Sequence, residues 1–469
     1  MMPALVTNTH LPLIYPYVPN QTLVIHNGNN ISQQQFLNDL HKVAAQLPNA
    51  GFALNLCEDR YYFLLAFCAL LIKGAVNLLP PNRQATTLAD LAQHYPDCYC
   101  LFDNHQLKDQ TCELPKLTLS DLLQNNSPPS DTAAANNTFL PVIPAQQIAA
   151  IAFTSGSTGA PKPNQKCWGT LAASARLLGE RITAHLSLPV IVATVPPQHM
   201  YGLESTLMMA LQTGAVMHSA KPFYPIEVQQ LLMQIHSPSI LVSAPTHLRA
   251  IANAELAMPA LAGIISATAP LDQPVALASE QCFNAPLWEI YGCTEAGAMA
   301  TRRSTQTQYW QLLDGFSLTL EGENISATAP HLSEIAPIQD QLTLSENGEF
   351  LLAGRNADMI NVAGKRSSLA HLTLQLLRIE GVDDGVIFLP QKPPQQLPQQ
   401  TKSQHEQRPA ALVVSELPEK EILAALAQRI DAVFLPRPLR KVTALPRNET
   451  GKLTAAALNA LWSQRNDKP

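Results

Sequence analysis

The chain has 469 residues, of which 46% are hydrophobic and 14% carry a charge, and its formal net charge is −6. A chain of this length and apolar content can form two or more domains, each with its own core. The slight acidity, with no long basic run, argues against nucleic acid as the main partner.

The eight cysteines are scattered along the chain, and none forms a Cys-x-x-Cys pair. Cys98 and Cys100 lie close in sequence but lack the second pair that a zinc site of this kind requires. We therefore expect reduced core cysteines and a cytoplasmic protein. The first residues have no basic segment ahead of an apolar core, so they do not resemble a signal peptide.

Residues 61–72 form a continuous apolar run that ends at Lys73-Gly74. This run is too short to cross a bilayer, which needs about 20 residues. We expect a buried helix here, followed by a strand at residues 75–79, and no stable membrane insertion.

Apolar strand patterns alternate with helical patterns along the rest of the chain. Strands are expected at residues 148–153, 190–195, 240–243 and 261–266, and helices at residues 226–235 and 271–282. Such alternation predicts the α/β class, here a large N-terminal domain of mostly parallel sheets with helices. We expect that domain at residues 1–354 and a small α+β lid domain at residues 355–469. The polar residues 123–140 and the Pro- and Gln-rich residues 390–408 are expected to be solvated loops.

The strand at residues 148–153 leads into Phe-Thr-Ser-Gly-Ser-Thr-Gly-Ala-Pro-Lys, residues 153–162. Glycines let a backbone turn its N–H groups toward an anion, while hydroxyls add donors and a lysine adds a charge. The loop is not a Walker A motif, because Pro161 stands where that motif has glycine. A plain Ser/Gly surface turn is the alternative. The candidate phosphate-binding residues are Thr154, Ser155, Gly156, Ser157, Thr158, Gly159 and Lys162.

Four later blocks accompany this loop. They are Tyr-Gly-Cys-Thr-Glu at 291–295, a Gly-Glu block at 322–330, a Gly-Arg block at 354–366 and Pro-Arg-Asn-Glu-Thr-Gly-Lys at 446–452. In content and order the five blocks resemble the adenylate-forming (AMP-binding) superfamily, which contains acyl- and aryl-CoA synthetases, peptide-synthetase adenylation domains and luciferases. The resemblance extends from residue 148 to residue 452.

The resemblance implies a two-step reaction that uses ATP and Mg²⁺. A carboxylate attacks the α-phosphate of ATP and expels pyrophosphate, and a thiol then attacks the acyl-adenylate and expels AMP. The thiol belongs to CoA or to an acyl carrier protein. Because the first step brings two anions together, cations must screen them.

The resemblance also assigns nucleotide contacts. The loop at 154–162 holds the β- and γ-phosphates, Thr294 holds the α-phosphate and Glu295 holds Mg²⁺, which prefers oxygen ligands. Tyr291 faces adenine, and Ala269-Pro270 lie beside it. The alternatives are a core aromatic for Tyr291, a solvated acid for Glu295 and an ordinary turn for Ala269-Pro270.

Three further residues complete the nucleotide site. Asp340 stands at the family's spacing before the Gly-Arg block and binds the ribose hydroxyls, although the usual Thr-Gly before it is missing. A strand-turn-strand at residues 342–352 fits that layout. Arg355 contacts the ribose or phosphate side of AMP. Lys452 bridges the attacking carboxylate and the α-phosphate, with a surface lysine as the alternative.

The carboxylic acid pocket follows the strand at 190–195. His199 in Pro-Pro-Gln-His-Met-Tyr-Gly lines the carboxylate and counts among the expected catalytic residues with Thr294, Glu295 and Lys452, although a lone histidine is more often structural. The expected pocket residues are His199, Tyr201, Gly202, Ala267 and Gly292.

Two positions depart from the family pattern: Ala357 occupies the hinge position, usually Asp or Lys, and Pro163 replaces a glycine. A hinge must only accommodate a backbone rotation, so alanine is compatible with it. The expected function is activation of an aryl or acyl carboxylic acid and its transfer to a pantetheine thiol. The short N-terminal region and the Pro-Pro-Gln-His-Met-Tyr-Gly block resemble stand-alone ligases that load hydroxyaryl groups, such as hydroxybenzoate, or short acyl groups onto a carrier protein in aryl polyene pathways. A medium- or long-chain fatty acyl-CoA synthetase and a non-catalytic adenylate-binding protein are the alternatives.

Overall fold

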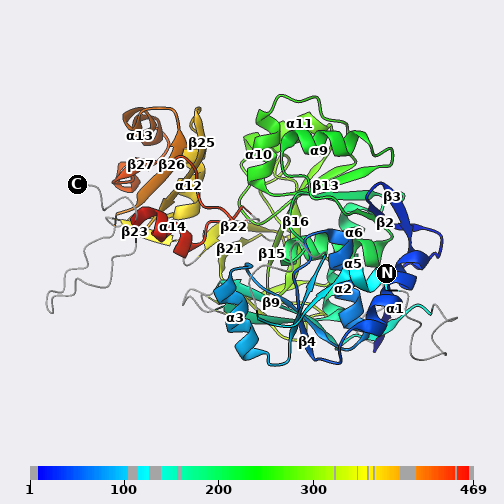
Figure 1. Cartoon of the computed structure of the whole chain (residues 1–469). Helices are drawn as coiled ribbons and strands as arrows, with labels where there is room; N and C mark the ends of the chain where they lie inside the picture. Colours follow the sequence, from blue (N-terminus) through cyan, green and yellow to red (C-terminus); the bar gives the residue numbers. More distant parts are fainter. Residues whose placement is uncertain are drawn as a thin grey trace. The chain divides into compact units, whose positions relative to one another are not determined.

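The protein is described here by a computed structural model (Figure 1). It describes residues 9–103, 113–125, 139–155, 161–321, 324–345, 347–355, 359–362, 365–390, 408–448 and 451–463. The chain divides into two compact units, Met1–Pro337 and Ile338–Pro469. The boundary expected between residues 354 and 355 falls at the end of strand β22 (Phe350–Arg355), and a hinge at that point stays a prediction.

The first unit is built on a nine-stranded sheet in the order β17-β16-β15-β14-β13-β11-β12-β2-β3. The six strands from β15 to β2 are parallel, and antiparallel strands close both edges. The strands are β2 (Thr22–His26), β3 (Asn29–Ser32), β11 (Val190–Ala193), β12 (Val216–His218), β13 (Ser239–Ser243), β14 (Gly263–Ser266), β15 (Leu287–Cys293), β16 (Gly297–Arg302) and β17 (Gln311–Leu312).

A second sheet of the same unit has six strands in the order β10-β9-β5-β4-β6-β7. All neighbours are parallel except β10 and β9, which form an antiparallel hairpin. The predicted α/β class with mostly parallel sheets is therefore confirmed. The strands are β4 (Phe52–Asn55), β5 (Val76–Leu79), β6 (Tyr99–Phe102), β7 (Lys116–Thr118), β9 (Ile148–Ser155) and β10 (Pro161–Cys167).

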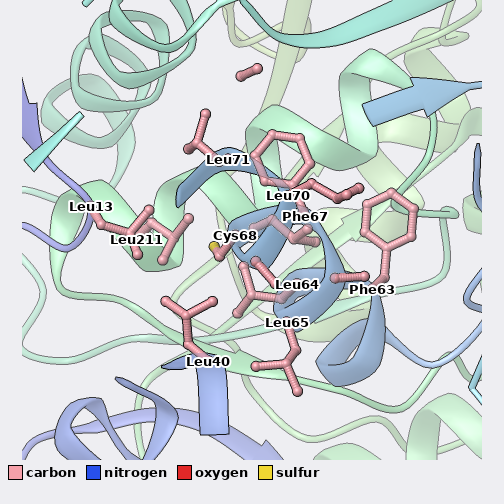
Figure 2. Close-up of a cluster of buried hydrophobic side chains, with 14 of the residues drawn as sticks. Leu13, Leu40, Phe63, Leu64, Leu65, Phe67, Cys68, Leu70, Leu71 and Leu211 are labelled. Atoms are coloured by element: carbon pink, nitrogen blue, oxygen red, sulfur yellow. The ribbon is translucent and has the colours of Figure 1, made fainter. Parts of the chain in front are cut away.

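The apolar run at residues 61–72 forms helix α2 (Arg60–Ile72), and most of its side chains are buried inside the protein. Asp59 caps the helix by accepting hydrogen bonds from the backbone of Tyr61 and Tyr62, and Gly74 leaves it with φ of +73°. Figure 2 shows this helix packed among side chains from other segments, such as Leu13, Leu40 and Leu211. Within the described residues, no helix has the length and apolar character that a membrane span needs. The prediction of a buried helix is confirmed.

Helices cover both faces of the nine-stranded sheet. Alternate strand residues such as Val192, Leu241 and Ile264 pack against α9, α10 and α11, which lie together beside β13 in Figure 1. The intervening residues, such as Ile191 and Ile265, pack with α6 and α8 on the other face. The helices of this unit are α1 (Gln33–Gln46), α2, α3 (Ala85–His94), α5 (Leu119–Gln124), α6 (Trp168–Ile182), α7 (Met200–Gly202), α8 (Met209–Thr213), α9 (Pro225–Met233), α10 (Pro245–Asn253) and α11 (Gln273–Phe283), with a π-helix η1 (Leu203–Met208).

Most boundaries differ from the sequence-based ones by one to three residues. Strand β11 ends at Ala193, because the chain turns at Thr194 toward the Pro196-Pro197 pair, and β14 begins at Gly263. Helix α5 occupies the start of the segment that we expected to be a loop at 123–140, and residues 126–138 lie outside the described part. Residues 391–407 of the other expected loop lie outside it too.

Smaller elements complete the first unit. They are β1 (His10–Pro12) paired with β8 (Val142–Pro144), the hairpin of β18 (Ser317–Glu321) and β19 (Asn324–Thr328), and β20 (Ala336–Ile338) at the division between the units. The seven described cysteines have free thiols, and Cys57, Cys68, Cys98 and Cys100 are buried. Four of the seven described cysteines are thus core residues as expected, whereas Cys167, Cys282 and Cys293 are half-buried.

The second unit has the α+β content expected of the C-terminal part. Its core lies between a three-stranded sheet and the helices beside it. The elements are β21 (Asp340–Leu344), β22, β23 (Met359–Val362), β24 (Lys365–Ser368), α12 (Leu369–Leu377), β25 (Val382–Phe388), β26 (Ala410–Ser415), α13 (Glu419–Ala427), η3 (Ala432–Phe434), β27 (Leu439–Lys441) and α14 (Ala455–Ser463).

Candidate functional site

The candidate site of the first unit lies where the parallel strands of the nine-stranded sheet end, which we call the carboxyl edge. Ligands of open α/β sheets bind outside this edge. The segment with His199 follows β11, Ala267 and Ala269-Pro270 follow β14, and Thr294-Glu295 follow β15. Because these strands are near neighbours in the sheet, the structure brings the three segments to the same edge.

Tyr201 fastens the first of these segments to the sheet. Its hydroxyl lies 2.9 Å from the carbonyl oxygen of Ser243 and 2.8 Å from that of Ile265, at the ends of β13 and β14. Burial of this ring raises its pKa, so the phenol stays protonated. Position 202 requires glycine for steric reasons, because a Cβ there would lie 2.0 Å from the carbonyl oxygen of Pro196. These contacts give both residues a structural role beside the pocket role that the sequence predicts.

His199 is half-buried at the start of α7. Its neighbour Met200 packs against the apolar core. The contact of His199 with a carboxylate stays a prediction.

The block at 291–295 comprises the last three residues of β15 and the first two of the tight turn to β16. Tyr291 is buried with its ring centroid 5.7 Å from that of Trp310, while Glu295 is exposed in the turn. A Cβ at Gly292 would lie 2.2 Å from the carbonyl oxygen of Gly297, so a larger residue would force the turn open. Gly297 has φ of +74°, which favours glycine. From the sequence, Gly292 was expected to line the pocket. In the structure the backbone at Gly297 comes so close to position 292 that a side chain there would collide with it.

One buried lysine and one buried glutamate form hydrogen bonds to the backbone of this turn and of the strand that follows it. Lys166 of β10 is 3% exposed, and its Nζ donates to the carbonyl oxygen of Glu295 at 2.7 Å. Glu204 of the π-helix is 4% exposed, and its Oε2 accepts from the backbone N–H of Ala298 at 3.1 Å. Burial lowers the pKa of Lys166 and raises that of Glu204, and each charge opposes the other's shift. Lys166 and Glu204 thus hold both sides of the turn.

Sequence reasoning missed these two residues. The available signal was a charge within an otherwise apolar segment, such as the glutamate in Gly-Leu-Glu-Ser-Thr-Leu-Met-Met. Charged residues are almost never fully buried unless they are paired. A π-helix such as η1 is frequently found at functional sites, although the sequence does not reveal it.

Lys166→Met should destabilise the protein by about 1–3 kcal/mol at neutral pH, because the carbonyl oxygen of Glu295 loses its donor and the buried Glu204 loses a nearby positive charge. The carboxyl then has a still higher pKa in the folded state. Such a group loses stabilisation as pH rises through its folded pKa, so the deficit should grow as the pH rises above the ordinary carboxyl range. Urea unfolding of Lys166→Met, Glu204→Gln and the double variant measures this. Coupling predicts that the double variant loses less than the sum of the single losses, whereas strict additivity would refute it.

The segment after β14 carries backbone strain. Thr268 has φ of +80°, which is rare for a β-branched residue, and it lies between Ala267 and the exposed Ala269-Pro270. Strained residues of this kind cluster at ligand sites. Thr268 was not among the expected residues, because no sequence pattern reports a positive φ for threonine.

The candidate phosphate loop joins β9 and β10. In this hairpin Ser155 lies opposite Pro161, and Thr154 lies opposite Lys162. Strand β9, which leads into the loop, lies beside β5 in the six-stranded sheet, so the strand predicted before the loop is present. Gly156, Ser157, Thr158 and Gly159 lie outside the described residues. Phosphate binding by this loop stays a prediction.

In the second unit, Asp340 and Arg355 lie directly opposite each other in the β21–β22 hairpin. Two residues that the sequence assigned to the nucleotide are therefore adjacent across the expected hairpin. Lys452 follows Gly451 in a short turn, which Gly451 N–H closes by donating to the carbonyl oxygen of Asn448 at 2.8 Å. The hinge residue Ala357 lies outside the described residues.

Magnesium was expected at Glu295. Among the described residues, no group of three or more His, Cys, Asp or Glu side chains gathers in a metal-binding cluster. Mg²⁺ in nucleotide sites usually takes one or two carboxylates and completes its coordination with phosphates and water. A single exposed carboxylate, Glu295, in a hydrogen-bonded turn fits that kind of site.

Comparison with known proteins agrees with this arrangement. The family model "AMP-binding enzyme" matches residues 17–320. A 4-coumarate–CoA ligase of Halorhodospira halophila is 26% identical over 318 residues, which are 64% of this chain and 73% of that protein. A 3,4-dihydroxybenzoate–[aryl-carrier protein] ligase of Bacillus anthracis is 21% identical over 327 residues, 67% of this chain and 74% of that protein.

The fold also matches solved structures. One is an o-succinylbenzoate CoA synthetase from Bacillus subtilis in complex with its acyl-adenylate intermediate, with a TM-score of 0.81 and 16% identity. The match covers 96% of this chain and 98% of that chain. The architecture of a large sheet-rich unit and a smaller C-terminal unit is therefore shared over nearly the whole length.

Proposed function

The chain belongs to the AMP-binding enzyme family, and we propose that it is an AMP-forming acid–thiol ligase. In the first step a carboxylate attacks the α-phosphate of ATP and releases pyrophosphate. In the second step a pantetheine thiol attacks the acyl-adenylate, which gives a thioester and AMP. The observation that carries this proposal is the meeting of three expected segments at one carboxyl edge, with the Thr294-Glu295 turn held from beneath by Lys166 and Glu204.

The chain's own residues supply positioning and charge. Thr294 at the turn donates to the α-phosphate, and Asp340 with Arg355 binds the ribose side of the nucleotide. Lys452 neutralises charge that develops as the two anions meet, and a preorganised cation of this kind lowers the barrier most in a dry site. A Mg²⁺ ion at Glu295 supplies further positive charge to the phosphates when it is bound.

We propose an aromatic, hydroxybenzoate-like carboxylic acid as the substrate. The support comes from two relatives, whose names specify 4-coumarate and 3,4-dihydroxybenzoate. The acid's carboxylate lies at His199, and its body lies along Tyr201, Gly202, Ala267 and Gly292. A supply of aromatic acids for a polyene pigment is consistent with this substrate class.

The test is release of AMP and pyrophosphate by the intact chain with ATP, Mg²⁺ and a panel of acids. The panel contains hydroxylated benzoates and cinnamates, short acids, and medium- and long-chain fatty acids. Turnover fastest with hydroxylated aromatic acids is the expected result. A preference for long alkyl acids would instead identify a fatty acyl-CoA synthetase. Failure with every acid, despite binding of AMP, would identify a non-catalytic adenylate-binding protein.

Removal of Mg²⁺ should abolish pyrophosphate release, and Glu295→Gln should raise the Mg²⁺ concentration needed for half-maximal rate. The reason is that one of the few protein ligands of the ion loses its charge. An unchanged Mg²⁺ requirement in that variant would show that Glu295 does not bind the metal.

The expected cytoplasmic location is also a proposal, supported by the free thiols of the seven described cysteines.

The thiol acceptor is proposed to be a carrier protein rather than free CoA. The support is a set of cations in the C-terminal unit, where Arg437 is exposed and Arg440 and Lys441 are half-buried. Arg440 also lies 3.9 Å from the ring centroid of Trp462, and Lys441 Nζ donates to the carbonyl oxygen of Glu416 at 3.1 Å. Only Arg437 is therefore suited to a charge reversal that leaves packing intact.

Arg437→Glu should slow transfer to an acidic carrier several-fold at low salt, because complementary charge accelerates association. The deficit should shrink as salt screens the charges over about 10 Å. Arg429→Glu is the matched control, since Arg429 is also an exposed arginine of this unit. Stopped thioester assays with carrier and with CoA at several salt concentrations measure both variants. Equal rates for Arg437→Glu and the control, together with efficient use of micromolar CoA, would contradict carrier steering.

A further inference from the structure

The C-terminal unit contains a two-pronged ion pair next to the block at 446–452. Arg447 Nε lies 2.7 Å from Asp384 Oδ2, and Arg447 Nη2 lies 2.6 Å from Asp384 Oδ1. Both side chains are about a quarter exposed. Bidentate pairs of this kind fix geometry as well as adding energy, because the guanidinium plane and the carboxylate plane must align.

The same guanidinium also holds the turn that leads to Lys452. Arg447 Nη1 donates to the carbonyl oxygen of Gly451 at 2.8 Å, and the backbone of Arg447 pairs with that of Leu453 in an isolated bridge. Arg447 thus contacts the residues on both sides of Lys452. Gly451 has φ of +77°, so the turn itself depends on a conformation that glycine adopts readily.

Asn448 fixes the backbone of Lys452 itself. The N–H of Asn448 donates to the carbonyl oxygen of Lys452 at 2.9 Å, and the N–H of Lys452 donates to Asn448 Oδ1 at 2.8 Å. Both backbone polar groups of Lys452 are therefore used locally. The starting point of the lysine side chain is set by Asn448 and, through Arg447, by strand β25, which carries Asp384.

We propose that Asp384 and Arg447 are positioning residues for Lys452 in the adenylation step. This inference rests on the proposed function and on the role of Lys452 in that step. The lysine side chain is long and flexible, so its reach toward a reacting phosphate depends on where its backbone is held. A displacement of about 1 Å at a reacting group costs up to about 10²-fold in rate.

A positioning role and a purely structural role predict different kinetics. If the pair only stabilised the fold of the unit, its loss would affect both half-reactions, because both need a folded C-terminal unit. If the pair positions Lys452, its loss affects adenylation alone, since Lys452 acts in that step. The two half-reactions are measured separately, as acid-dependent exchange of pyrophosphate into ATP and as transfer of pre-formed acyl-adenylate to a thiol.

The variants are Asp384→Asn, Arg447→Gln and their combination in the full chain. We expect kcat for exchange to fall about 10- to 100-fold, with KM for ATP nearly unchanged and transfer from acyl-adenylate within about two-fold of the parent. The double variant should be no slower than Arg447→Gln alone, because the two side chains act as one unit. Arg447→Lys should restore part of the rate, as a single cation replaces the two-pronged contact.

Asp431→Asn is the matched control, because Asp431 also pairs with a cation, Lys365, in the same unit but lies away from the turn in sequence. Asparagine keeps the acceptor that the backbone N–H of Val433 uses. This control should leave both half-reactions unchanged. Equal losses in both half-reactions for Asp384→Asn, or an unchanged exchange rate, would overturn the positioning role. If the parent protein catalysed neither half-reaction, the proposed function would fail first, and this inference with it.

Discussion

Lys452→Ala should nearly abolish acid-dependent adenylation and leave thioester formation from pre-made acyl-adenylate largely intact. Loss of one preorganised charge stabiliser typically costs about 10²- to 10³-fold in rate. The second half-reaction has no attacking carboxylate to neutralise, so it should not need this ammonium group. Pyrophosphate exchange measures the first step, and thiol transfer from synthetic acyl-adenylate measures the second.

Lys420→Ala is the control for this experiment, because Lys420 is an exposed lysine of α13 in the same unit. It should behave like the parent protein in both assays. Comparable losses in both half-reactions of Lys452→Ala would show that the lysine does not act in one step alone, and would contradict its assignment to adenylation.

Asp340→Ala should raise KM for ATP by about 10- to 100-fold. A carboxylate that accepts from both ribose hydroxyls is lost, and hydrogen bonds to charged groups contribute about 1.5–3 kcal/mol. The rate at saturating ATP should change less, since the ribose contact is present both before and during the reaction. Initial rates of pyrophosphate release over a range of ATP concentrations measure the effect.

Thr343→Ala tests whether the effect is specific, because Thr343 is an exposed residue on the same strand, β21. Its KM for ATP should match that of the parent. An unchanged KM in Asp340→Ala would mean that a different carboxylate binds the ribose. The direct pairing of Asp340 with Arg355 across the hairpin favours Asp340.

The general fold was predictable because hydrophobic periodicity reports local structure. The strands at β9, β13 and β14 and the helices α2, α9 and α11 appear where apolar runs of the right length appear in the sequence. The boundaries were less predictable, because they depend on tertiary contacts. Helix α5, for instance, continues to Gln124, into a segment whose composition is that of a loop.

Candidate site residues could be named from the sequence only where they fall in a short motif, and their roles stay predictions. Thr294 and Glu295 could be found in this way, but Lys166 and Glu204 could not, because they reach the turn from β10 and from a π-helix distant in sequence. The strain at Thr268 was equally hidden. Contacts of this kind depend on three-dimensional packing. The sequence shows at most an isolated charge in an apolar segment, and not the group that this charge contacts.

The role of Arg447 shows the same limit. The sequence places it in the block at 446–452, but its partner Asp384 lies on β25, and the two are joined only by the folded sheet. Gly202 and Gly292 show the reverse case. The sequence suggested a pocket for both, and the structure adds that a side chain at either position would collide with a carbonyl oxygen.

The most direct test of the central claim uses a carboxylic acid labelled with ¹⁸O in both carboxylate oxygens. The acid is incubated with the protein, ATP, Mg²⁺ and an acceptor thiol, and the AMP is analysed by mass spectrometry. If the carboxylate attacks the α-phosphate and the thiol then attacks the acyl carbon, one labelled oxygen remains on AMP and the thioester keeps the other. AMP without label, or ADP and phosphate as products, would contradict an acyl-adenylate intermediate and with it the proposed function.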